Sequence, residues 1–376
     1  MIHVGINAQI VTFRSNYRQA GVSRFTEQLI RALQRRDTDA RYSVFLNETA
    51  RGGFNDSSNM RFRYTRLPAV KPAVRVLWEQ LLLPLMSGSF DVLHCPVNVL
   101  PATLGCPAVL TIHDLTFLRY PERFRPERRR YLTTFTSLSA KRAARVMTDS
   151  VHTKQDVMEL LRVPADKIEV VYPGVDDEFQ PQPQEKVAEL RRRYGLPEEF
   201  ILYVGTLEPR KNVELLLRAY NLLLGRGLLQ WPLVIGGGAG WMFDRIFSEV
   251  ERSGLTDRVI FPGYIDPGDL ACWYTAASAF VYPSIYEGFG LPPLEAMACG
   301  TPVIVSDTSS LPEVVGDAGI KIDPRNAEEL ADRLAEVLQS KDKREQLAAA
   351  GRARAASFTW DRAARQTMQV YRQASR

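Results

Sequence analysis

The stretch Ser284-Ile-Tyr-Glu-Gly-Phe-Gly-Leu-Pro-Pro-Leu-Glu-Ala-Met-Ala-Cys-Gly-Thr-Pro302 decides the fold of this chain. It lies between two short apolar runs, Ala279–Tyr282 and Val303–Val305, whose β-branched and aromatic residues indicate strands. Gly288 and Gly290 carry no side chain, so the loop after the first strand can present its backbone amides to a ligand. We therefore expect a strand, a ligand-binding loop, a helix and a second strand in this order.

The same stretch predicts a helix N-terminus with a carboxylate on each side of the loop. Pro292 and Pro293 suit the first turn of a helix, which we expect to continue over Leu294–Ala298. Glu287 precedes the glycines, and Glu295 lies one turn into the helix. Free amides at a helix N-terminus favour phosphate, and carboxylates accept hydrogen bonds from sugar hydroxyls. A nucleotide sugar offers both groups, whereas the alternative interpretation is a surface loop with incidental acids.

The two glutamates, with seven residues between them, resemble the E-x7-E signature of the retaining GT-B glycosyltransferases, in particular family 4. The resemblance implies an α/β protein with two Rossmann-like, doubly wound parallel-sheet domains that face each other across a cleft. It assigns Glu295 to ribose hydroxyls of a nucleotide sugar, and Glu287 to a sugar hydroxyl near the anomeric carbon. The backbone amides that would bind sugar and phosphate are those of Gly288, Phe289, Gly290 and Leu291.

A second loop, Gly205-Thr-Leu-Glu-Pro-Arg-Lys-Asn212, follows another apolar run and precedes a predicted helix. Arg210 and Lys211 offer a planar fork and a point charge to a pyrophosphate. The alternative, a basic helix start on the surface, is disfavoured because cations there oppose the helix dipole. The loop resembles the donor-phosphate site of family 4, with Lys211 at the position of its main phosphate lysine. Thr206 stands where many members have arginine, and Arg210 takes over that charge.

The first half of the chain contributes two further candidates. His113-Asp114-Leu115 follows the apolar run Ala108–Ile112, which places the histidine at the carboxyl end of a strand. A lone histidine there is commonly structural, but this segment resembles the part of family 4 enzymes that reaches the donor sugar near the reaction centre. The resemblance gives that role to His113, with Asp114 in support. Gly21 opens the first helix, where the family has a glycine near acceptor and phosphate.

A glycine turn, Ile235-Gly-Gly-Gly-Ala-Gly-Trp241, does not predict a dinucleotide site, because Trp241 stands where the motif needs a third small residue. Family 4 enzymes carry a similar turn near the nucleotide. Phe261-Pro-Gly-Tyr-Ile265 resembles their base-binding loop, which gives Gly263, Tyr264 and Ile265 as base-site candidates.

No metal or other cofactor is expected. Asp37-Thr-Asp39 has the spacing of a metal-binding D-x-D motif, but it lies between a predicted helix and a predicted strand and is interpreted as a loop. In this interpretation the cations Arg210 and Lys211 neutralise the leaving diphosphate, which a metal does in other transferases.

Apolar runs alternate with helical patterns along the whole chain, which predicts parallel sheets covered by helices. In the first half the predicted strands are Ile2–Ala8, Tyr42–Leu46, Phe62–Leu67, Asp91–His94, Ala108–His113, Val146–Thr148 and Ile168–Tyr172. The predicted helices there are Val22–Arg36, Val74–Met86, Pro126–Arg145 and Val151–Leu161. We expect a first domain over residues 1–176, a proline-rich linker at 180–184 and a donor-binding domain over 185–357. Residues 358–376 should form a helix that crosses back to the first domain.

Composition is that of a globular protein. The 376 residues are 45% hydrophobic and 24% charged, which is enough for two domains with separate cores. The four cysteines are scattered, as in a reduced cytoplasmic protein. The chain start does not resemble a signal peptide, and the longest apolar run, Leu81–Met86, is too short to span a membrane. We expect this run to form a buried helix face.

Positive charge is concentrated in the first half of the chain. Residues 1–180 carry a net charge of +7 and the remainder −2, with nine basic residues between Arg119 and Arg145. This segment is either a solvated helical face or a surface for anionic lipid head groups or a phosphorylated acceptor. The second interpretation predicts weak peripheral contact with a membrane surface. Nucleic acid is not expected, because no binding motif accompanies the charge.

These features predict a retaining, metal-independent glycosyltransferase. The favoured donor is GDP-mannose, because the segments around Lys211 and His113 resemble those of mannosyltransferases, while UDP-glucose and other sugars remain open. The acceptor would be a glycan or a lipid-linked sugar, and front-face attack is preferred over a covalent intermediate on Glu287. The alternatives are a nucleotide-sugar hydrolase or epimerase of the same fold, and a non-catalytic nucleotide-sugar-binding partner in a glycan assembly complex.

Overall fold

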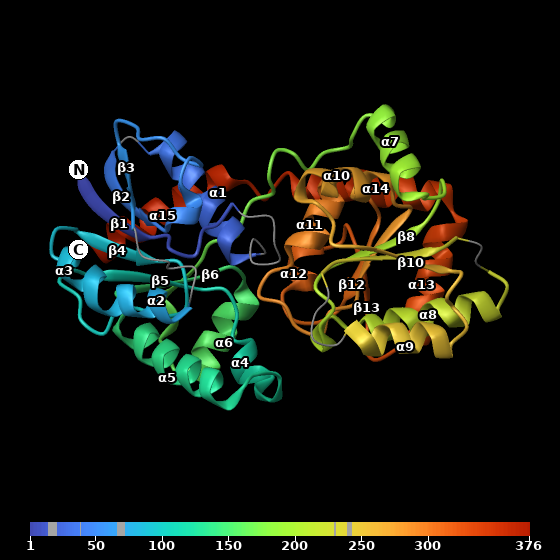
Figure 1. The fold of residues 1–376 in the computed structure, drawn as a ribbon, viewed down its shortest axis with the longest axis horizontal. Helices are drawn as coiled ribbons and strands as arrows, with labels where there is room; N and C mark the ends of the chain where they lie inside the picture. Colours follow the sequence, from blue (N-terminus) through green and yellow to red (C-terminus); the bar gives the residue numbers. More distant parts are fainter. Residues whose placement is uncertain (14–20, 38, 66–71, 229–230, 239–242) are drawn as a thin grey trace. The chain divides into compact units, whose positions relative to one another are not determined.

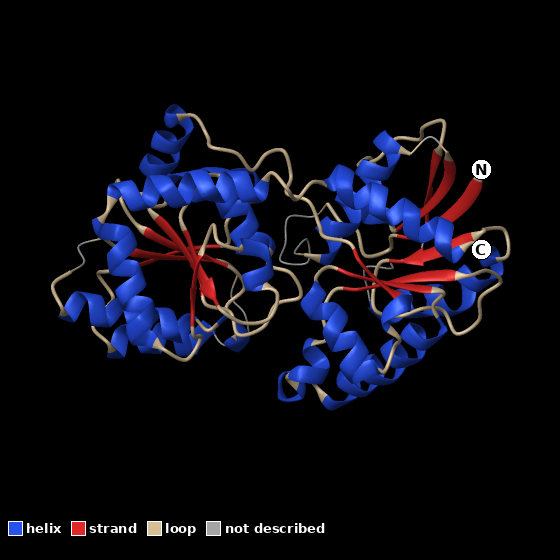
Figure 2. Cartoon of the chain, turned by 180° about the vertical axis from the view of Figure 1, so that it is seen from behind, coloured by secondary structure: helices blue, strands red, loops and turns tan. Residues whose placement is uncertain are grey.

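The computed structural model describes residues 1–13, 21–37, 39–65, 72–228, 231–238 and 243–376 (Figure 1). They form two compact units. One unit contains residues 1–174 together with 359–376, and the other contains residues 175–358. Each unit has a parallel β-sheet with helices on both of its faces (Figure 2).

The first unit is built on a seven-stranded parallel sheet of order β3-β2-β1-β4-β5-β6-β7. Its strands are β1 (Ile2–Asn7), β2 (Ala40–Leu46), β3 (Met60–Tyr64), β4 (Val92–Cys95), β5 (Ala108–Ile112), β6 (Arg145–Thr148) and β7 (Ile168–Val170). Its longer helices are α1 (Val22–Arg36), α5 (Pro126–Arg142), α6 (Val151–Leu161) and α15 (Trp360–Ala374), and its shorter ones are α2 (Pro72–Leu77), α3 (Leu83–Ser87) and α4 (Thr116–Arg119).

The second unit is built on a six-stranded parallel sheet of order β10-β9-β8-β11-β12-β13. Its strands are β8 (Ile201–Val204), β9 (Leu233–Gly236), β10 (Val259–Gly263), β11 (Ala279–Tyr282), β12 (Val303–Ser306) and β13 (Ile320–Ile322). Its helices are α7 (Gln184–Tyr194), α8 (Val213–Gly225), α9 (Phe243–Arg252), α10 (Pro267–Ala276), α11 (Leu291–Ala298), α12 (Leu311–Val315), α13 (Ala327–Gln339) and α14 (Lys341–Ala355).

Both sheets have the doubly wound topology that the sequence predicts. In each sheet the first three strands follow one another toward one edge, and the later strands follow one another toward the opposite edge. The strand order therefore reverses beside β1 in the first sheet and beside β8 in the second. Loops that leave neighbouring strands diverge at such a reversal, and ligands of α/β proteins bind in the crevice between them. In the second unit this point lies between β8 and β11.

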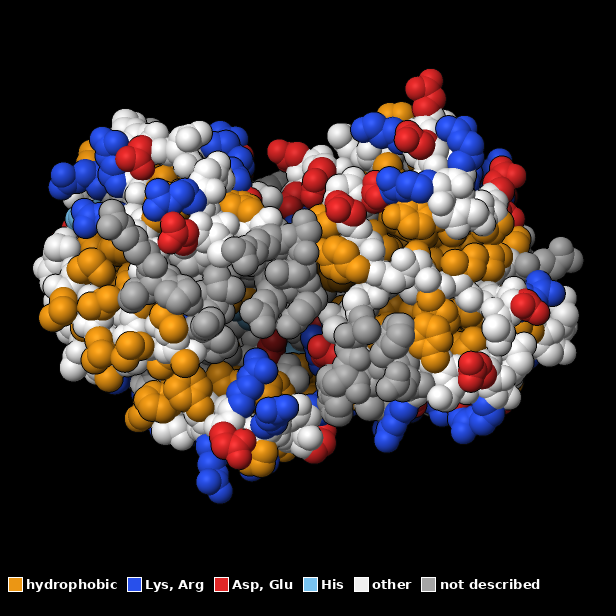
Figure 3. All heavy atoms as spheres, in the orientation of Figure 1, with side chains coloured by type: hydrophobic (Ala, Val, Ile, Leu, Met, Phe, Trp, Pro, Cys, Tyr) orange, Lys and Arg blue, Asp and Glu red, His pale blue; other side chains and the backbone are white. Residues whose placement is uncertain are grey.

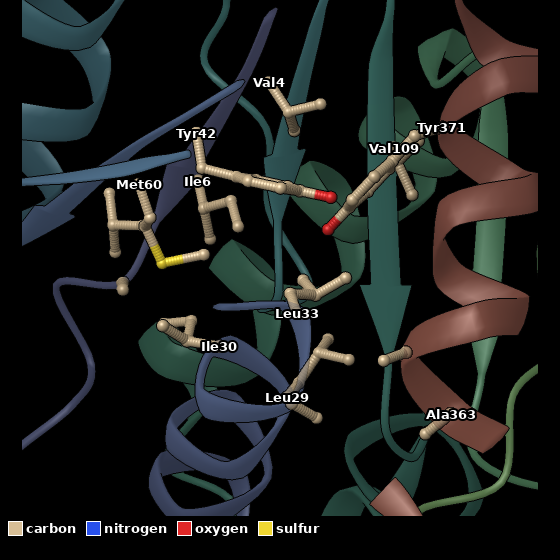
Figure 4. Close-up of a cluster of buried hydrophobic side chains, with 14 of the residues drawn as sticks. Val4, Ile6, Leu29, Ile30, Leu33, Tyr42, Met60, Val109, Ala363 and Tyr371 are labelled. Atoms are coloured by element: carbon tan, nitrogen blue, oxygen red, sulfur yellow. The ribbon is translucent and has the colours of Figure 1, made fainter. Parts of the chain in front are cut away.

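The C-terminal helix α15 belongs to the core of the first unit. Tyr371 is completely buried, and its hydroxyl lies 2.8 Å from Nδ1 of His94 on β4. Figure 4 shows Tyr371 and Ala363 beside core residues of β1, β2 and α1. Within the first unit, a Cβ on Gly174 would lie 2.2 Å from the backbone nitrogen of Trp360. Only glycine therefore allows residue 174 to approach the start of α15 this closely.

The predicted helix over Val74–Met86 differs from the structure in detail. It consists of α2, a π-helical turn at Trp78–Leu82 and α3. The expectation that Leu81–Met86 forms a buried face is wrong for most of the run, because Leu83 is buried whereas Leu81, Leu82 and Leu85 are exposed. The predicted strand over Phe62–Leu67 ends at Tyr64, and residues 66 and 67 lie outside the described part of the chain. Among the described residues, no helix is both long and apolar enough to cross a membrane.

Candidate active site

Two loops meet where the strand order of the second sheet reverses. The first loop, residues 205–212, follows β8 and includes a 3-10 turn at Pro209–Lys211. The second loop, residues 283–290, follows β11 and leads into α11. The amide of Ile285 donates to the carbonyl of Arg210 at 2.7 Å, so the loops are fastened to each other by their backbones.

Glu287 and Lys211 form a buried ion pair across these loops. Nζ of Lys211 lies 2.5 Å from Oε1 of Glu287, and both side chains are buried. The same Nζ donates to the hydroxyl of Tyr282, the last residue of β11. Ser284 Oγ donates to Oε1 of Glu287 at 2.6 Å. The carboxylate is thus held by donors from both loops.

Arg210 binds the second oxygen of the same carboxylate. Its NH1 lies 2.9 Å from Oε2 of Glu287 and donates to the carbonyl of Tyr286 at 3.1 Å. Its Nε lies 3.2 Å from Oε2 of Glu208. Arg210 and Lys211, predicted as a pair of phosphate-binding cations, therefore converge on Glu287, one as a planar fork and the other as a point charge.

The electrostatics of this cluster keep Glu287 ionised. Burial alone would raise the pKa of its carboxyl, but the charges of Arg210 and Lys211, with hydrogen bonds from Lys211 and Ser284, lower the pKa to about 2. Burial and the charge of Arg210 lower the pKa of Lys211 from its ordinary value, while Glu287 acts in the opposite sense. A cation next to a fixed carboxylate can bind an incoming anion through its remaining hydrogen-bond donors.

The loop around Glu287 is braced from the segment after β12. The hydroxyl of Ser309 accepts from the amide of Glu287 at 3.0 Å. Ser310 Oγ lies 3.0 Å from the carbonyl of Glu287 and 2.6 Å from that of Phe289, which is itself buried. Gly290 has a φ of +116°, and a Cβ there would lie 2.8 Å from Leu311. The turn at Gly290, which a residue with a side chain could not adopt without strain, sets the direction in which α11 begins, at Leu291.

Glu295, the second glutamate of the motif, has a different environment. It lies inside α11, is buried, and accepts a hydrogen bond from the hydroxyl of Tyr274 at 3.1 Å. Tyr274 belongs to α10, whereas Glu287 is bound to the two cations. The two glutamates of the motif therefore lie in one segment but contact different residues: Glu287 binds the two cations and Glu295 binds Tyr274.

The glycine turn packs against the loop after β8. Gly237 has a φ of +148°, and a Cβ there would lie 2.0 Å from the carbonyl oxygen of Gly205, beside the partly exposed Thr206. Its amide donates to the carbonyl of Gly263 at 2.8 Å. In the predicted base loop, Tyr264 is exposed, whereas Ile265 is buried and its Cδ1 would lie 2.3 Å from a Cβ on Gly236. Trp241, which bears on the rejected dinucleotide motif, lies outside the described residues.

His113 belongs to the first unit and follows β5. Its Nδ1 lies 2.6 Å from Oδ2 of Asp149, and its Nε2 lies 3.0 Å from the carbonyl oxygen of Pro96. Burial lowers the pKa of His113, but the charge of Asp149 and the hydrogen bonds to Asp149 and Pro96 outweigh it, so the pKa is raised. Both partners of the ring are acceptors, which favours an imidazolium that donates from both nitrogens. Asp114 accepts from the amide of Thr116 at the start of α4.

Gly21 precedes α1 with a φ of +53°, and a Cβ there would meet no atom within 4 Å. The neighbouring segment 14–20 lies outside the described residues. In the D-x-D sequence, Asp37 is buried, ends α1 and accepts a hydrogen bond from Tyr42, while Asp39 pairs with Arg372. Within the described ranges, no three His, Cys, Asp or Glu side chains come together as metal ligands.

Several partners of the candidate residues, in each unit by itself, did not follow from the sequence. Tyr282, Ser284 and Ser310 contact Lys211 or Glu287, and Asp149 holds His113. A signal for Asp149 exists, because it follows β6, the neighbour of β5 in the sheet, and the carboxyl ends of parallel strands meet at one edge. For Ser310 a comparable signal exists in the polar segment that follows β12.

Comparison with known proteins identifies the class. The family of glycosyl transferases group 1 matches residues 187–354, and glycosyltransferase family 4 matches residues 20–179. The chain is 37% identical over 280 residues to O-antigen chain mannosyltransferase B of Escherichia coli, covering 74% of this chain and 73% of that protein. It is 32% identical over 259 residues to the serotype-specific mannosyltransferase WbdA of Escherichia coli, and the match spans about a third of WbdA.

Solved structures agree on the fold. HepE of Anabaena, crystallised with UDP and glucose, superposes with a TM-score of 0.74 at 17% identity, over 98% of this chain and 99% of that chain. WaaG, a glycosyltransferase involved in lipopolysaccharide biosynthesis, gives a TM-score of 0.73 at 16% identity, over 98% and 99% of the two chains. The fold and the family matches together define a glycosyltransferase with the GT-B fold. Within that class, the chain belongs to glycosyltransferase family 4.

Proposed function

We propose that this glycosyltransferase moves mannose from GDP-mannose to a glycan or lipid-linked acceptor, with retention of the anomeric configuration and without a metal. The observation that carries the proposal is the cluster of Glu287, Lys211 and Arg210 at the switch point of the second sheet. Mannose as the transferred sugar is supported by the resemblance to the Escherichia coli mannosyltransferases. HepE, which was crystallised with UDP-glucose, keeps a glucosyl donor as the alternative.

The cluster can serve both ends of a nucleotide sugar. Lys211 and Arg210 are donors only, and their charges can be shared between Glu287 and a diphosphate. Glu287 is ionised and is fixed by Ser284, so its oxygens can accept from a sugar hydroxyl in a defined direction. Glu295 would hold the ribose hydroxyls. The amides of residues 288–291, Thr206 and the base loop 263–265 would complete the donor site.

In the proposed reaction the acceptor hydroxyl attacks the anomeric carbon from the face that the diphosphate leaves. The bond between that carbon and the phosphate oxygen breaks as the new glycosidic bond forms, and the hydroxyl proton passes to the departing phosphate. Lys211 and Arg210 stabilise the charge that accumulates on the diphosphate. His113, whose ring is held by Asp149, would contact the sugar near the reacting carbon.

The test is a donor panel, assayed by release of nucleoside diphosphate with and without added glycan acceptors. GDP-mannose should give release that depends on the acceptor, and the mannosidic bond in the product should have the α configuration of the donor by NMR. A chelator should leave the rate unchanged. Release without an acceptor would favour a hydrolase, and a β product would overturn retention. Transfer from another donor in the panel would overturn the assignment of mannose.

A further inference from the structure

The helical stretch 72–87 of the first unit directs a row of leucines to solvent. Leu77, Leu81 and Leu85 follow one another at four-residue intervals and are 56%, 59% and 82% exposed. Leu82, beside them, is also exposed. The inward face is supplied by other residues, among them Trp78 and Leu83. The outward leucines are therefore not needed for the core of this unit.

Helix α5 carries a second apolar row of the same kind. Tyr131, Phe135 and Leu138 recur at intervals of four and three residues, which places them on one side of the helix. Leu138 is 52% exposed, Phe135 is exposed as well, and its ring packs against that of Tyr131 at 4.8 Å between centroids. Arg128 and Arg142 continue the row at its two ends.

The two rows lie on neighbouring elements, because both elements bind the loop 100–102 and Tyr131 of α5 is close enough to Glu79 and Arg75 to feel their charges. From the first element, Gln80 donates to the carbonyl of Leu100 at 3.3 Å. From α5, Ser139 Oγ accepts from the amide of Leu100 at 2.8 Å, and Arg142 donates to the carbonyl of Pro101 at 3.1 Å. We call the six exposed side chains Leu77, Leu81, Leu82, Leu85, Phe135 and Leu138 the apolar face. Figure 3 shows hydrophobic side chains gathered where Figure 1 places α2 and α3.

Positive charge borders the apolar face. Along α5 the exposed cations are Arg128, Arg129, Arg130, Lys141 and Arg142, and the helix contains one acid, Glu127. The cations lie in the first and last turns, and the apolar row lies between them. Large apolar side chains flanked by arginine and lysine are the composition of surfaces that lie in the boundary between lipid head groups and acyl chains.

We propose that the apolar face docks on the surface of an anionic lipid bilayer, with its leucines among the acyl chains and the cations of α5 on lipid phosphates. The positive charge of α5 disfavours a second copy of the chain as the partner that covers the apolar face. A symmetric dimer would bury the same patch from both copies, and so would bring the cations of α5 into an interface with their own duplicates. Lipid phosphates neutralise these cations instead. The proposal does not depend on which sugar the enzyme transfers.

The experiment is co-sedimentation of the full chain with vesicles of phosphatidylcholine alone and of equimolar phosphatidylcholine and phosphatidylglycerol. The wild type should bind the anionic vesicles and lose binding as salt is raised. The variant Leu81→Gln/Leu85→Gln should weaken binding by about tenfold or more, since each leucine loses its burial in the acyl region. Arg128→Gln/Arg129→Gln/Arg130→Gln should weaken binding by about fivefold for each charge.

Matched controls replace exposed residues away from the apolar face. Met158→Gln/Leu228→Gln removes two exposed apolar side chains, and Arg41→Gln/Arg192→Gln/Arg362→Gln removes three exposed cations. Both should bind like the wild type, and all variants should keep the wild-type rate with a water-soluble acceptor. Equal binding to both vesicle types, or full binding by the leucine variant, overturns the proposal. A wild-type dimer in sedimentation velocity that the leucine variant abolishes would assign the face to a second copy and overturn it as well.

Discussion

Lys211 is the residue whose removal separates the two tasks of the cluster. It compensates Glu287 in the free enzyme. In the proposed reaction its charge would matter most when the diphosphate departs. We predict that Lys211→Ala lowers kcat by about a hundredfold or more, the size expected for a lost electrostatic donor. The donor Kd should rise by much less, because Arg210 remains. Nucleoside diphosphate release gives kcat, and calorimetry gives Kd.

The control for this change is Lys186→Ala, which removes an exposed lysine from the same unit and should leave both constants unchanged. If Lys211→Ala raises Kd as strongly as it lowers kcat, Lys211 stabilises the bound donor and its transition state equally. That outcome would contradict a specific role in the departure of the diphosphate.

Glu295 is predicted to contribute to donor affinity. Glu295→Gln keeps the side-chain shape and an oxygen for the hydroxyl of Tyr274, but removes the charge that would bind ribose. A charged hydrogen bond contributes roughly 1.5–3 kcal/mol, so donor affinity should fall by about tenfold or more while the fold stays intact. Titration calorimetry with the donor measures this. Tyr274→Phe serves as the comparison, and unchanged affinity in Glu295→Gln would remove Glu295 from the donor site.

Asp149 is predicted to set the protonation of His113. The carboxylate raises the pKa of the imidazole, so Asp149→Asn should lower this pKa and the ring should lose its proton at a lower pH. If the imidazolium is the active form, the alkaline fall in kcat/KM shifts to lower pH as well. NMR titration of the four histidines, with His113→Gln for assignment, measures the pKa directly. An unshifted His113 titration would contradict this role, and Asp166→Asn, an exposed carboxylate, is the control.

Local signals allowed Glu287, Arg210 and Lys211 to be predicted as site residues, because glycines, prolines and adjacent cations mark loops at the ends of strands. The direct contact between Glu287 and the two cations could not be predicted. It depends on β8 and β11 being neighbours, although they are far apart in the sequence. Asp149 was missed for the same reason, because its partner His113 follows a different strand of the sheet.

At the scale of the elements, the loops after β8, β9 and β10 pack closely against one another, and this packing leads to a prediction for Gly237. A side chain at Gly237 would meet the backbone of Gly205, and the φ of +148° is unfavourable for any other residue. Gly237→Ala should therefore destabilise the second unit by about 2–4 kcal/mol and separate the loop after β8 from the base loop. Gly238→Ala is the matched control, because a Cβ there meets nothing within 4 Å. Urea unfolding measures both, and equal stability of the two variants would show that the loops can shift freely.

The elements themselves could be predicted where the pattern was simple. Buried parallel strands are short apolar runs, and α1 and α6 have the predicted bounds, Val22–Arg36 and Val151–Leu161. The stretch 72–87 is different, because its leucines occur on both faces of the helix and a π-helical turn changes the period. Hydrophobicity alone predicts burial there, whereas the structure buries Glu79 and exposes Leu85.

At the scale of the whole molecule, the first unit depends on a helix from the far end of the chain. α15 packs on α1, and Asp361 in the first turn of α15 forms an ion pair with Arg36 at the end of α1. Tyr371 reaches the buried His94, whose other ring nitrogen lies 2.8 Å from the hydroxyl of Thr111. Each ring nitrogen of His94 therefore has a hydroxyl partner, which suits a neutral imidazole.

This arrangement predicts an acid-sensitive first unit. Full burial, with the charge of His113, lowers the pKa of His94 to about 3, against about 6.5 in the unfolded chain. The neutral ring therefore contributes full stability above pH 6.5, and this contribution is lost as the pH falls toward 3, by about 1.4 kcal/mol for each pH unit. His94→Gln should remove this slope, so the stability difference from wild type should shrink between pH 7 and pH 4 by roughly 3–4 kcal/mol.

The variant Tyr371→Phe separates the effect of the hydrogen bond between Tyr371 and His94 from the effect of His94 protonation. It leaves His94 buried, so the acid slope should persist, while the lost partner should lower stability at pH 7 by about 1–3 kcal/mol. Urea unfolding of the first unit, followed through the NMR signals of its core methyl groups, measures both variants. If His94→Gln keeps the wild-type pH dependence, the acid sensitivity resides in the carboxylates of the unit. The titration of His94 would then make no contribution to the stability of the first unit.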